Sequence, residues 1–249
     1  MTMTKAIPAA LAALAFSMHA VAADGPAAPP TKRVSFPKGA SETTIKGALK
    51  GRGDMDYLVR AAAGQTLEVT MEGTNAQNDF NVLPPGSKDV AMFNSAMTGE
   101  RSYKGMLPTD GDYAIRVYLG RAAGRRGEAS AYTIKVAVKG EALKPLPASR
   151  DAKVAGTAYH ATAEVSCLPP FASATESCKA GVIRRSPEGS ATFEAVAKSG
   201  LKRRVLFVKG RPVASDANEP LSSSRDGDKT IVKVGDERYE VPDPFITGG

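Results

Sequence analysis

The feature that most constrains the fold of this chain is an alternation of apolar and polar residues with a period of two. In Thr66–Glu72 the apolar residues at 67, 69 and 71 fall on one face, with threonine and glutamate on the other. Asp112–Leu119 and Tyr132–Val138 repeat this pattern, and Asp56–Ala61 follows it more loosely. Strands with one face on a core and one in water have this period. Because no helical periodicity is evident between residues 33 and 139, we predict a β-sandwich there.

A second strand-rich region follows a short segment of linker composition. Residues 140–153 contain two prolines together with alanine and charged side chains, which is typical of a linker. Beyond it, turn residues separate five strand-like segments: Ala180–Arg185, Ser190–Ala197, Arg203–Val208, Lys229–Val234 and Arg238–Val241. We therefore predict an all-β protein in which a second, smaller β domain of unknown function spans residues 154–249.

The N-terminal segment has the composition of a secretory signal peptide. A single cation at Lys5 precedes an apolar stretch over 9–16, and small residues follow at 20, 22 and 23. The stretch is shorter than the roughly 20 apolar residues of a spanning helix, and no later segment of the chain resembles one. We expect residues 1–23 to be removed, residues 24–32 to form an extended, loosely held lead-in, and a soluble protein to remain in the periplasm.

The two cysteines of the chain predict a structural disulfide. Cys167 and Cys178 lie close together in a chain expected to reach an oxidising compartment. A zinc site normally needs four ligands, and the mature chain has only one histidine, His160. We accordingly expect no metal and no cofactor.

Charge and residue types narrow the possible functions. Loss of Lys5 with the signal peptide leaves 32 basic and 26 acidic residues, a net charge of +6. Residues 24–150 carry 18 basic and 13 acidic side chains, whereas 151–249 carry 14 and 13, so the excess lies in the first region. An acidic partner is expected, and nucleic acid is disfavoured by the compartment. No nucleophile motif surrounds His160, so we predict no catalytic residues and no enzyme. The sequence does not exclude a pair of catalytic carboxylates of the kind that glycoside hydrolases use.

Two short motifs favour ordinary structural roles. Arg52-Gly53-Asp54 matches an adhesion tripeptide, but a glycine between opposite charges is typical of a plain turn. Lys202-Arg203-Arg204 resembles a nucleic-acid patch, but it enters a strand without an aromatic stacking partner. We interpret it as a solvated strand start.

The strongest candidate for partner binding is a run of arginines between two confident strands. Arg121, Arg125 and Arg126 lie among glycines and alanines directly after Asp112–Leu119. We expect them at one hairpin tip, as a narrow positive projection on a rigid β scaffold. Arginine can grip carboxylates bidentately, so such a projection suits a slot lined by Asp or Glu.

The same region resembles the periplasmic inhibitors of g-type (goose-type) lysozyme. The resemblance spans about residues 33–139 and rests on the phrases A-G-Q-T-L-E-V from Ala63, F-N-V from Phe80 and G-D-Y-A-I-R-V from Gly111, followed by the Arg121 and Arg125 pair. It implies a β-sandwich whose arginine loop enters the substrate cleft of the lysozyme. Arg121 and Arg125 would be the inserted cations, with Arg126 and Tyr57 as secondary contacts.

One alternative class stays open at this point. A non-catalytic envelope module that binds an acidic cell-wall or surface glycan would also use the three arginines. Sugar-binding faces commonly use aromatic platforms, however, and the chain has no tryptophan and only 6% aromatic residues. The family resemblance covers less than half of the chain and implies nothing for residues 151–249.

Overall fold

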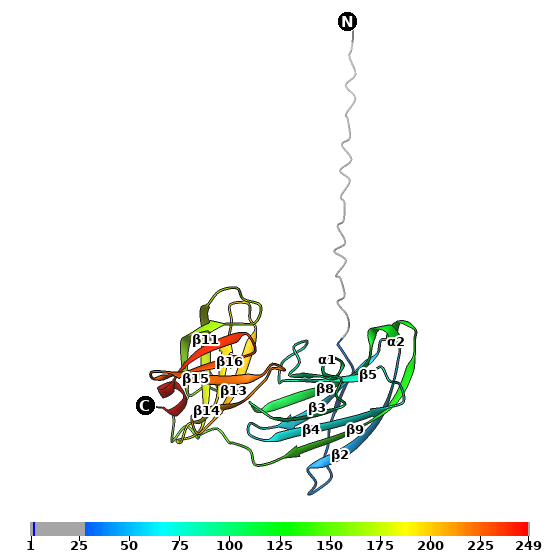
Figure 1. The fold of residues 1–249 in the computed structure, drawn as a ribbon, viewed down its shortest axis with the longest axis horizontal. Coiled ribbons are helices and arrows are strands. Elements are labelled where there is room, and N and C mark those ends of the chain that lie inside the picture. Colours follow the sequence, from blue (N-terminus) through cyan, green and yellow to red (C-terminus); the bar gives the residue numbers. More distant parts are fainter. Residues whose placement is uncertain (1, 3–27, 249) are drawn as a thin grey trace.

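The computed structural model describes residue 2 and residues 28–248, and it confirms the all-β class (Figure 1). The expected signal peptide, residues 1–23, falls almost wholly outside the described residues, as do residues 24–27 of the lead-in. Three helices of four or five residues accompany the strands in the described part: α1 Ser95–Thr98, α2 Arg121–Arg125 and α3 Asp243–Thr247. Within the same part, no helix is long and apolar enough to cross a membrane.

Residues 31–139 form a β-sandwich of two sheets, which we call the N-terminal sandwich. One sheet has the order β1-β3-β8-β5-β6, and the other has the order β2-β9-β4-β7. Their bounds are β1 Thr31–Arg33, β2 Glu42–Lys50, β3 Asp54–Ala61, β4 Thr66–Gly73, β5 Asn78–Leu83, β6 Phe93–Asn94, β7 Ser102–Met106, β8 Gly111–Leu119 and β9 Ala129–Lys139. The pairs are antiparallel except for β1 with β3.

The period-two pattern predicts the core of the sandwich correctly. Leu67, Val69 and Met71 of β4 are at most 2% exposed, and they pack in one cluster with Ile115 and Val117 of β8 in the opposite sheet. The apolar faces of the two sheets therefore cover each other, as the alternation requires.

The end of the lead-in is more firmly held than the sequence suggests. Residues 31–33 pair with Asp56, Tyr57 and Leu58 as a parallel strand, and Arg33 forms an ion pair with Asp112 at 2.9 Å. The expectation of a loosely held segment is therefore wrong for its last two residues, because they complete the edge of a sheet.

Residues 161–242 form a single eight-stranded antiparallel sheet, which we call the C-terminal sheet. Its order is β14-β13-β12-β11-β10-β17-β16-β15. The bounds are β10 Ala161–Leu168, β11 Glu176–Ser186, β12 Ser190–Val196, β13 Lys202–Val208, β14 Arg211–Ser215, β15 Leu221–Asp226, β16 Lys229–Val234 and β17 Glu237–Pro242. The sheet curls so far that its two edge strands, β14 and β15, approach each other (Figure 1). A second apolar cluster fills its interior.

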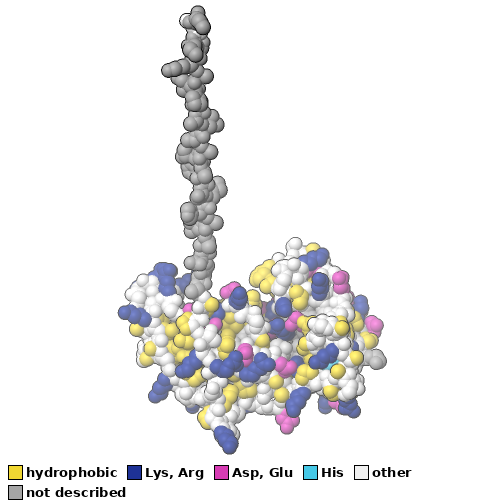
Figure 2. Space-filling model, turned by 180° about the vertical axis from the view of Figure 1, so that it is seen from behind, with side chains coloured by type: hydrophobic (Ala, Val, Ile, Leu, Met, Phe, Trp, Pro, Cys, Tyr) yellow, Lys and Arg dark blue, Asp and Glu magenta, His cyan; other side chains and the backbone are white. Residues whose placement is uncertain are grey.

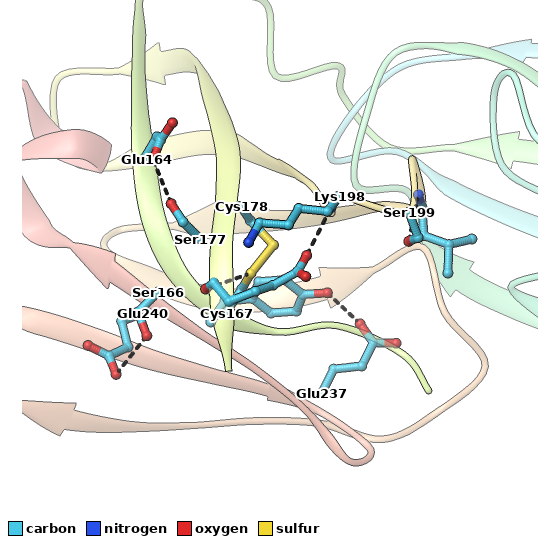
Figure 3. The surroundings of a disulfide bond; sticks show 12 residues. Glu164, Ser166, Cys167, Ser177, Cys178, Lys198, Ser199, Glu237 and Glu240 are labelled. Carbon is cyan, nitrogen blue, oxygen red and sulfur yellow. Dashed lines mark hydrogen bonds between the residues drawn. A yellow bond between two sulfur atoms is a disulfide. The ribbon is translucent and has the colours of Figure 1, made fainter. Parts of the chain in front are cut away.

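The predicted disulfide is present and joins the neighbouring strands β10 and β11 (Figure 3). Cys167 and Cys178 are both 1% exposed, and their Cα atoms lie 5.9 Å apart. The bond closes the short connection between these strands and leaves no free cysteine among the described residues.

The basic run at the start of β13 differs from its interpretation as a solvated strand start. Arg203 is 5% exposed, and its guanidinium pairs with Glu237 at 2.6 Å and Asp216 at 3.0 Å. Arg204 pairs with Glu194 at 2.7 Å. The strand turns these side chains toward buried carboxylates, so internal partners rather than counterions balance their charge.

The expected linker makes hydrogen bonds to both regions. The Leu143 amide donates to the Ala63 carbonyl at 2.9 Å, and the Leu146 amide donates to the Arg184 carbonyl at 2.8 Å. The division into two domains around residues 140–153 stays a prediction.

Candidate functional site

The three predicted arginines lie where the chain crosses from one sheet of the sandwich to the other. β8 belongs to the first sheet and β9 to the second, so the segment between them is not the hairpin tip that the sequence suggested. Residues 121–125 form one helical turn, α2, at the end of the sandwich (Figure 1). A helix this short has no periodicity to detect and depends on tertiary contacts.

Small residues hold α2 against the sandwich. Ala123 is fully buried in the core cluster, and the Gly120 amide donates to the Gln77 carbonyl at 2.7 Å. A Cβ atom at Gly124 would lie 3.2 Å from the Gly51 carbonyl oxygen, so glycine allows α2 to lie close to the β2–β3 turn. The backbone of the arginine segment is therefore fixed from two sides.

Glu128 ties the end of this segment to a third loop. Its carboxylate accepts a hydrogen bond from the Asn75 side chain at 2.7 Å and another from Arg126 Nε at 2.6 Å. These two bonds hold the pKa of Glu128 below its ordinary value. The Gly51 amide also donates to the Glu128 carbonyl at 2.8 Å, so the loops at this end form one connected unit.

Arg121 and Arg125 are both exposed and lie on the same face of α2, four residues apart. Arg52, from the turn between β2 and β3, joins them and lines the same shallow hollow of about 360 Å³, whose other lining residues are Leu119 and Gly124. No carboxylate of the described residues forms a salt bridge with these three guanidinium groups, although 16 such bridges occur elsewhere in that part of the chain.

This cluster of Arg52, Arg121 and Arg125, which we call the arginine cluster, gives one end of the sandwich a strong positive charge. Figure 2 shows Lys and Arg side chains gathered at the end of the molecule where α2 lies in Figure 1. Three neighbouring cations that have no salt-bridge partner in the described part of the chain repel one another, and a carboxylate brought between them relieves that repulsion. The geometry therefore suits an acidic group that enters the hollow.

Arg52 is not among the predicted site residues, because the tripeptide 52–54 is typical of a plain turn. The turn itself is present, since residues 51–53 connect β2 and β3. Its position beside α2 follows from the pairing of strands that are far apart in the sequence, which a local motif does not reveal.

The two secondary candidates occupy different environments from Arg121 and Arg125. Arg126 is exposed, but it already has a partner in Glu128. Tyr57 is 3% exposed, and its hydroxyl lies 2.9 Å from that of Tyr132 inside the sandwich. Tyr57 therefore has no free surface to offer a partner, which corrects its predicted place on the contact surface. It points inward because it shares the buried face of β3 with Val59 and Ala61.

His160, the histidine considered for catalysis, has a structural role. It is 6% exposed, and its Nδ1 accepts a hydrogen bond from the Arg184 amide at 2.9 Å. Nε2 lies 3.0 Å from the Leu146 carbonyl, so this nitrogen carries the proton and donates it. Both nitrogens are thus committed to backbone groups.

The chain has a relative among known proteins. No family model matches the chain. An inhibitor of g-type lysozyme from Escherichia coli (strain K12) is 28% identical over 109 residues, which cover 43% of this chain and 79% of the relative. The chain is similar to inhibitors of g-type lysozyme. This similarity confirms the resemblance inferred for the first region and accounts for less than half of the chain.

Solved structures of such inhibitors also match a similar share of the chain. PliG of Aeromonas hydrophila, a periplasmic inhibitor of g-type lysozyme, is 33% identical, with 45% of this chain and 98% of that chain covered and a TM-score of 0.42. PliG of Salmonella Typhimurium is 27% identical, with 44% and 98% covered and a TM-score of 0.36. These relatives are described as inhibitors, not as enzymes.

Proposed function

We propose that this protein is a periplasmic inhibitor of g-type lysozyme that inserts Arg121 and Arg125 into the acidic substrate cleft of the enzyme. Its similarity to inhibitors from other bacteria supports the inhibitory role. The observation that carries the proposed surface is the pair of exposed arginines, one helical turn apart, without an acidic partner among the described residues. The protein would act in the periplasm after losing residues 1–23.

The arrangement of the arginine cluster explains how a small surface could block an enzyme. A lysozyme needs an acidic group to cleave its substrate, so a cation at that group opposes the chemistry as well as the entry of substrate. Guanidinium groups form strong bidentate hydrogen bonds with carboxylates. Because contacts from Ala123, Gly124 and Gly120 already fix α2, little conformational freedom is lost when the complex forms.

The direct test replaces Arg121 and Arg125 together by alanine. We expect inhibition of g-type lysozyme to be abolished while the thermal midpoint stays nearly unchanged, because both side chains are exposed in the free protein. Each single substitution should weaken binding by about 2 kcal/mol or more, as is usual when one member of a buried charge pair is removed. Inhibition is measured as protection of cell walls from lysis, and unfolding is followed by circular dichroism.

A matched control removes the same charge elsewhere. Arg150 and Arg211 are also exposed and form no salt bridge within the described part of the chain. The Arg150→Ala/Arg211→Ala variant should inhibit as the wild type does. Equal loss of inhibition in both double variants would mean that only net charge matters, and unfolding of the Arg121→Ala/Arg125→Ala variant would mean that these arginines are structural.

A further inference from the structure

The C-terminal sheet carries an aromatic side chain that has no structural role in the described protein. Phe171 lies between β10 and β11 and is fully exposed, with a relative accessibility of 102%. Its backbone has a φ of +63°, in the left-handed region that a bulky residue rarely adopts. An exposed ring on a strained backbone is an arrangement that packing does not explain, and such outliers concentrate at functional sites.

The loop that presents Phe171 is firmly supported. The Cys167–Cys178 disulfide closes it at its base (Figure 3). Pro169 and Pro170 precede the phenylalanine, and Pro169 is buried. On the other side of the loop, Glu176 accepts a hydrogen bond from the Lys198 amide at 2.8 Å. The ring is therefore held out on a fixed base rather than on a freely moving segment.

The composition of this loop indicates what it can bind. Residues 167–175 contain no charged side chain. A lone aromatic ring among small and apolar residues suits an apolar pocket on a protein, where Phe is enriched at the centre of interfaces. An acidic glycan or an anionic lipid surface would instead call for cations in the loop.

The loop stands in a fixed relation to the arginine cluster. Arg185 of β11 has a fully buried side chain, which pairs with Asp110 of the N-terminal sandwich at 3.1 Å. Thr192 of β12 donates a hydrogen bond to the Pro108 carbonyl at 2.7 Å, and Arg204 reaches the Pro85 carbonyl at 3.1 Å. Contacts of this kind orient the C-terminal sheet on the sandwich.

We infer that Phe171 is a second contact with the lysozyme, entering an apolar pocket outside the substrate cleft while the arginine cluster occupies the cleft. The inference rests on the proposed function and extends it to the region for which the relatives offer no counterpart. Because Phe171 and the arginine cluster belong to one rigid scaffold, the second contact forms with little further loss of conformational and rotational entropy.

The test measures the affinity of the full mature chain for a purified g-type lysozyme by titration calorimetry. Phe171→Gly removes the ring and relieves the left-handed backbone, so its thermal midpoint should stay close to that of the wild type. We expect its dissociation constant to rise about tenfold or more, as for an aromatic residue at the centre of an interface. Phe171→Leu should keep most of the affinity. Val213→Ala, which shortens an exposed apolar side chain on β14, is the matched control and should bind as the wild type does.

The possible outcomes separate this inference from the proposed function. Wild-type affinity in Phe171→Gly, together with weak binding by Arg121→Ala/Arg125→Ala, overturns the second contact and leaves the inhibitor proposal intact. A strong fall in the thermal midpoint of Phe171→Gly assigns the ring a structural role and also overturns the second contact. Absence of binding by the wild-type chain overturns both proposals.

Discussion

At the scale of single residues, the pair formed by Tyr57 and Tyr132 shows how a polar group is accommodated in the sandwich core. The two rings meet edge to face with their centroids 6.4 Å apart, and their hydroxyls form a hydrogen bond at 2.9 Å. Burial raises the pKa of Tyr132. The hydrogen bond between the two hydroxyls satisfies polar groups that would otherwise be buried without a partner. Tyr57 thus stabilises the core of the sandwich.

This assignment predicts the behaviour of Tyr57→Phe. The substitution leaves the Tyr132 hydroxyl buried without its partner, which should lower the free energy of unfolding by about 1–2 kcal/mol. Inhibition of g-type lysozyme should be unchanged, because Tyr57 does not reach the surface. Urea denaturation and the lysis assay measure the two effects. Loss of inhibition without a change in the free energy of unfolding would show that Tyr57 contacts the lysozyme and would contradict this assignment.

The residues of the candidate site differ in how far the sequence could predict them. Arg121 and Arg125 directly follow a strand that alternates clearly, so their place at the end of the sandwich could be predicted. Tyr57 is spaced by two residues from Val59 and by four from Ala61, so the alternation already indicates that its side chain shares their inward face. The family resemblance instead suggested a place on the contact surface. Arg52 depends on contact between the β2–β3 turn and α2, which are far apart in the sequence, and no local pattern carries that information.

At the scale of elements, the arginine-bearing segment depends on its neighbours for its conformation. A turn of five residues is too short to be a stable helix by itself. Asn75, Arg126 and Glu128 connect α2, the start of β9 and the loop before β5 through side-chain hydrogen bonds. The geometry of the arginine cluster therefore depends on the charge of one carboxylate.

Acidification should lower the local stability of residues 120–128. The folded-state pKa of Glu128 is depressed below 4.5, so the contribution of its hydrogen bonds is complete above that pH. It is lost as the pH falls through the depressed value, because the protonated group binds Arg126 less strongly. The protection factors of the amides in residues 120–128, which correct for the intrinsic pH dependence of exchange, should fall over that range. In Glu128→Gln the same amides should have lower protection factors already at neutral pH, without further change on acidification; a pH response of the protection factors equal to that of the wild type would contradict this account.

Elements without apolar periodicity, such as β15, α1 and α2, are not predicted from the sequence. β15 is not among the predicted strands, because most of its side chains are polar and exposed at the edge of the sheet. Helices α1 and α2 are each about one turn long, so neither presents a repeating face. By contrast, β4, β8 and β9 bury one face each, and the alternation identified all three.

At the scale of the whole molecule, Arg185 links the C-terminal sheet to the sandwich. Its fully buried guanidinium contacts Asp110, the Leu143 carbonyl and the Thr192 hydroxyl. Burial lowers the pKa of Arg185, which indicates that its environment penalises the charge and that Asp110 is needed to balance it. The Asp110 carboxylate also accepts a hydrogen bond from the Ala63 amide at 2.9 Å.

Removal of Asp110 should therefore destabilise the protein as a whole. Asp110→Ala leaves a buried cation without a counter-charge, which typically costs about 3 kcal/mol, toward the low end for buried pairs because Asp110 is itself partly exposed. Asp112→Ala, two residues away, breaks only the exposed pairs with Arg33 and Arg60 and should change stability much less. Urea denaturation of both variants measures the difference. Equal effects would show that Arg185 does not depend on Asp110.

The proposed inhibition of g-type lysozyme is tested most directly by a cell-wall lysis assay with the purified mature protein. The assay compares goose-type, chicken-type and invertebrate-type lysozymes over the same range of inhibitor concentrations. We predict inhibition of the goose-type enzyme alone. Absence of inhibition of the goose-type enzyme at inhibitor concentrations well above that of the lysozyme would contradict the account.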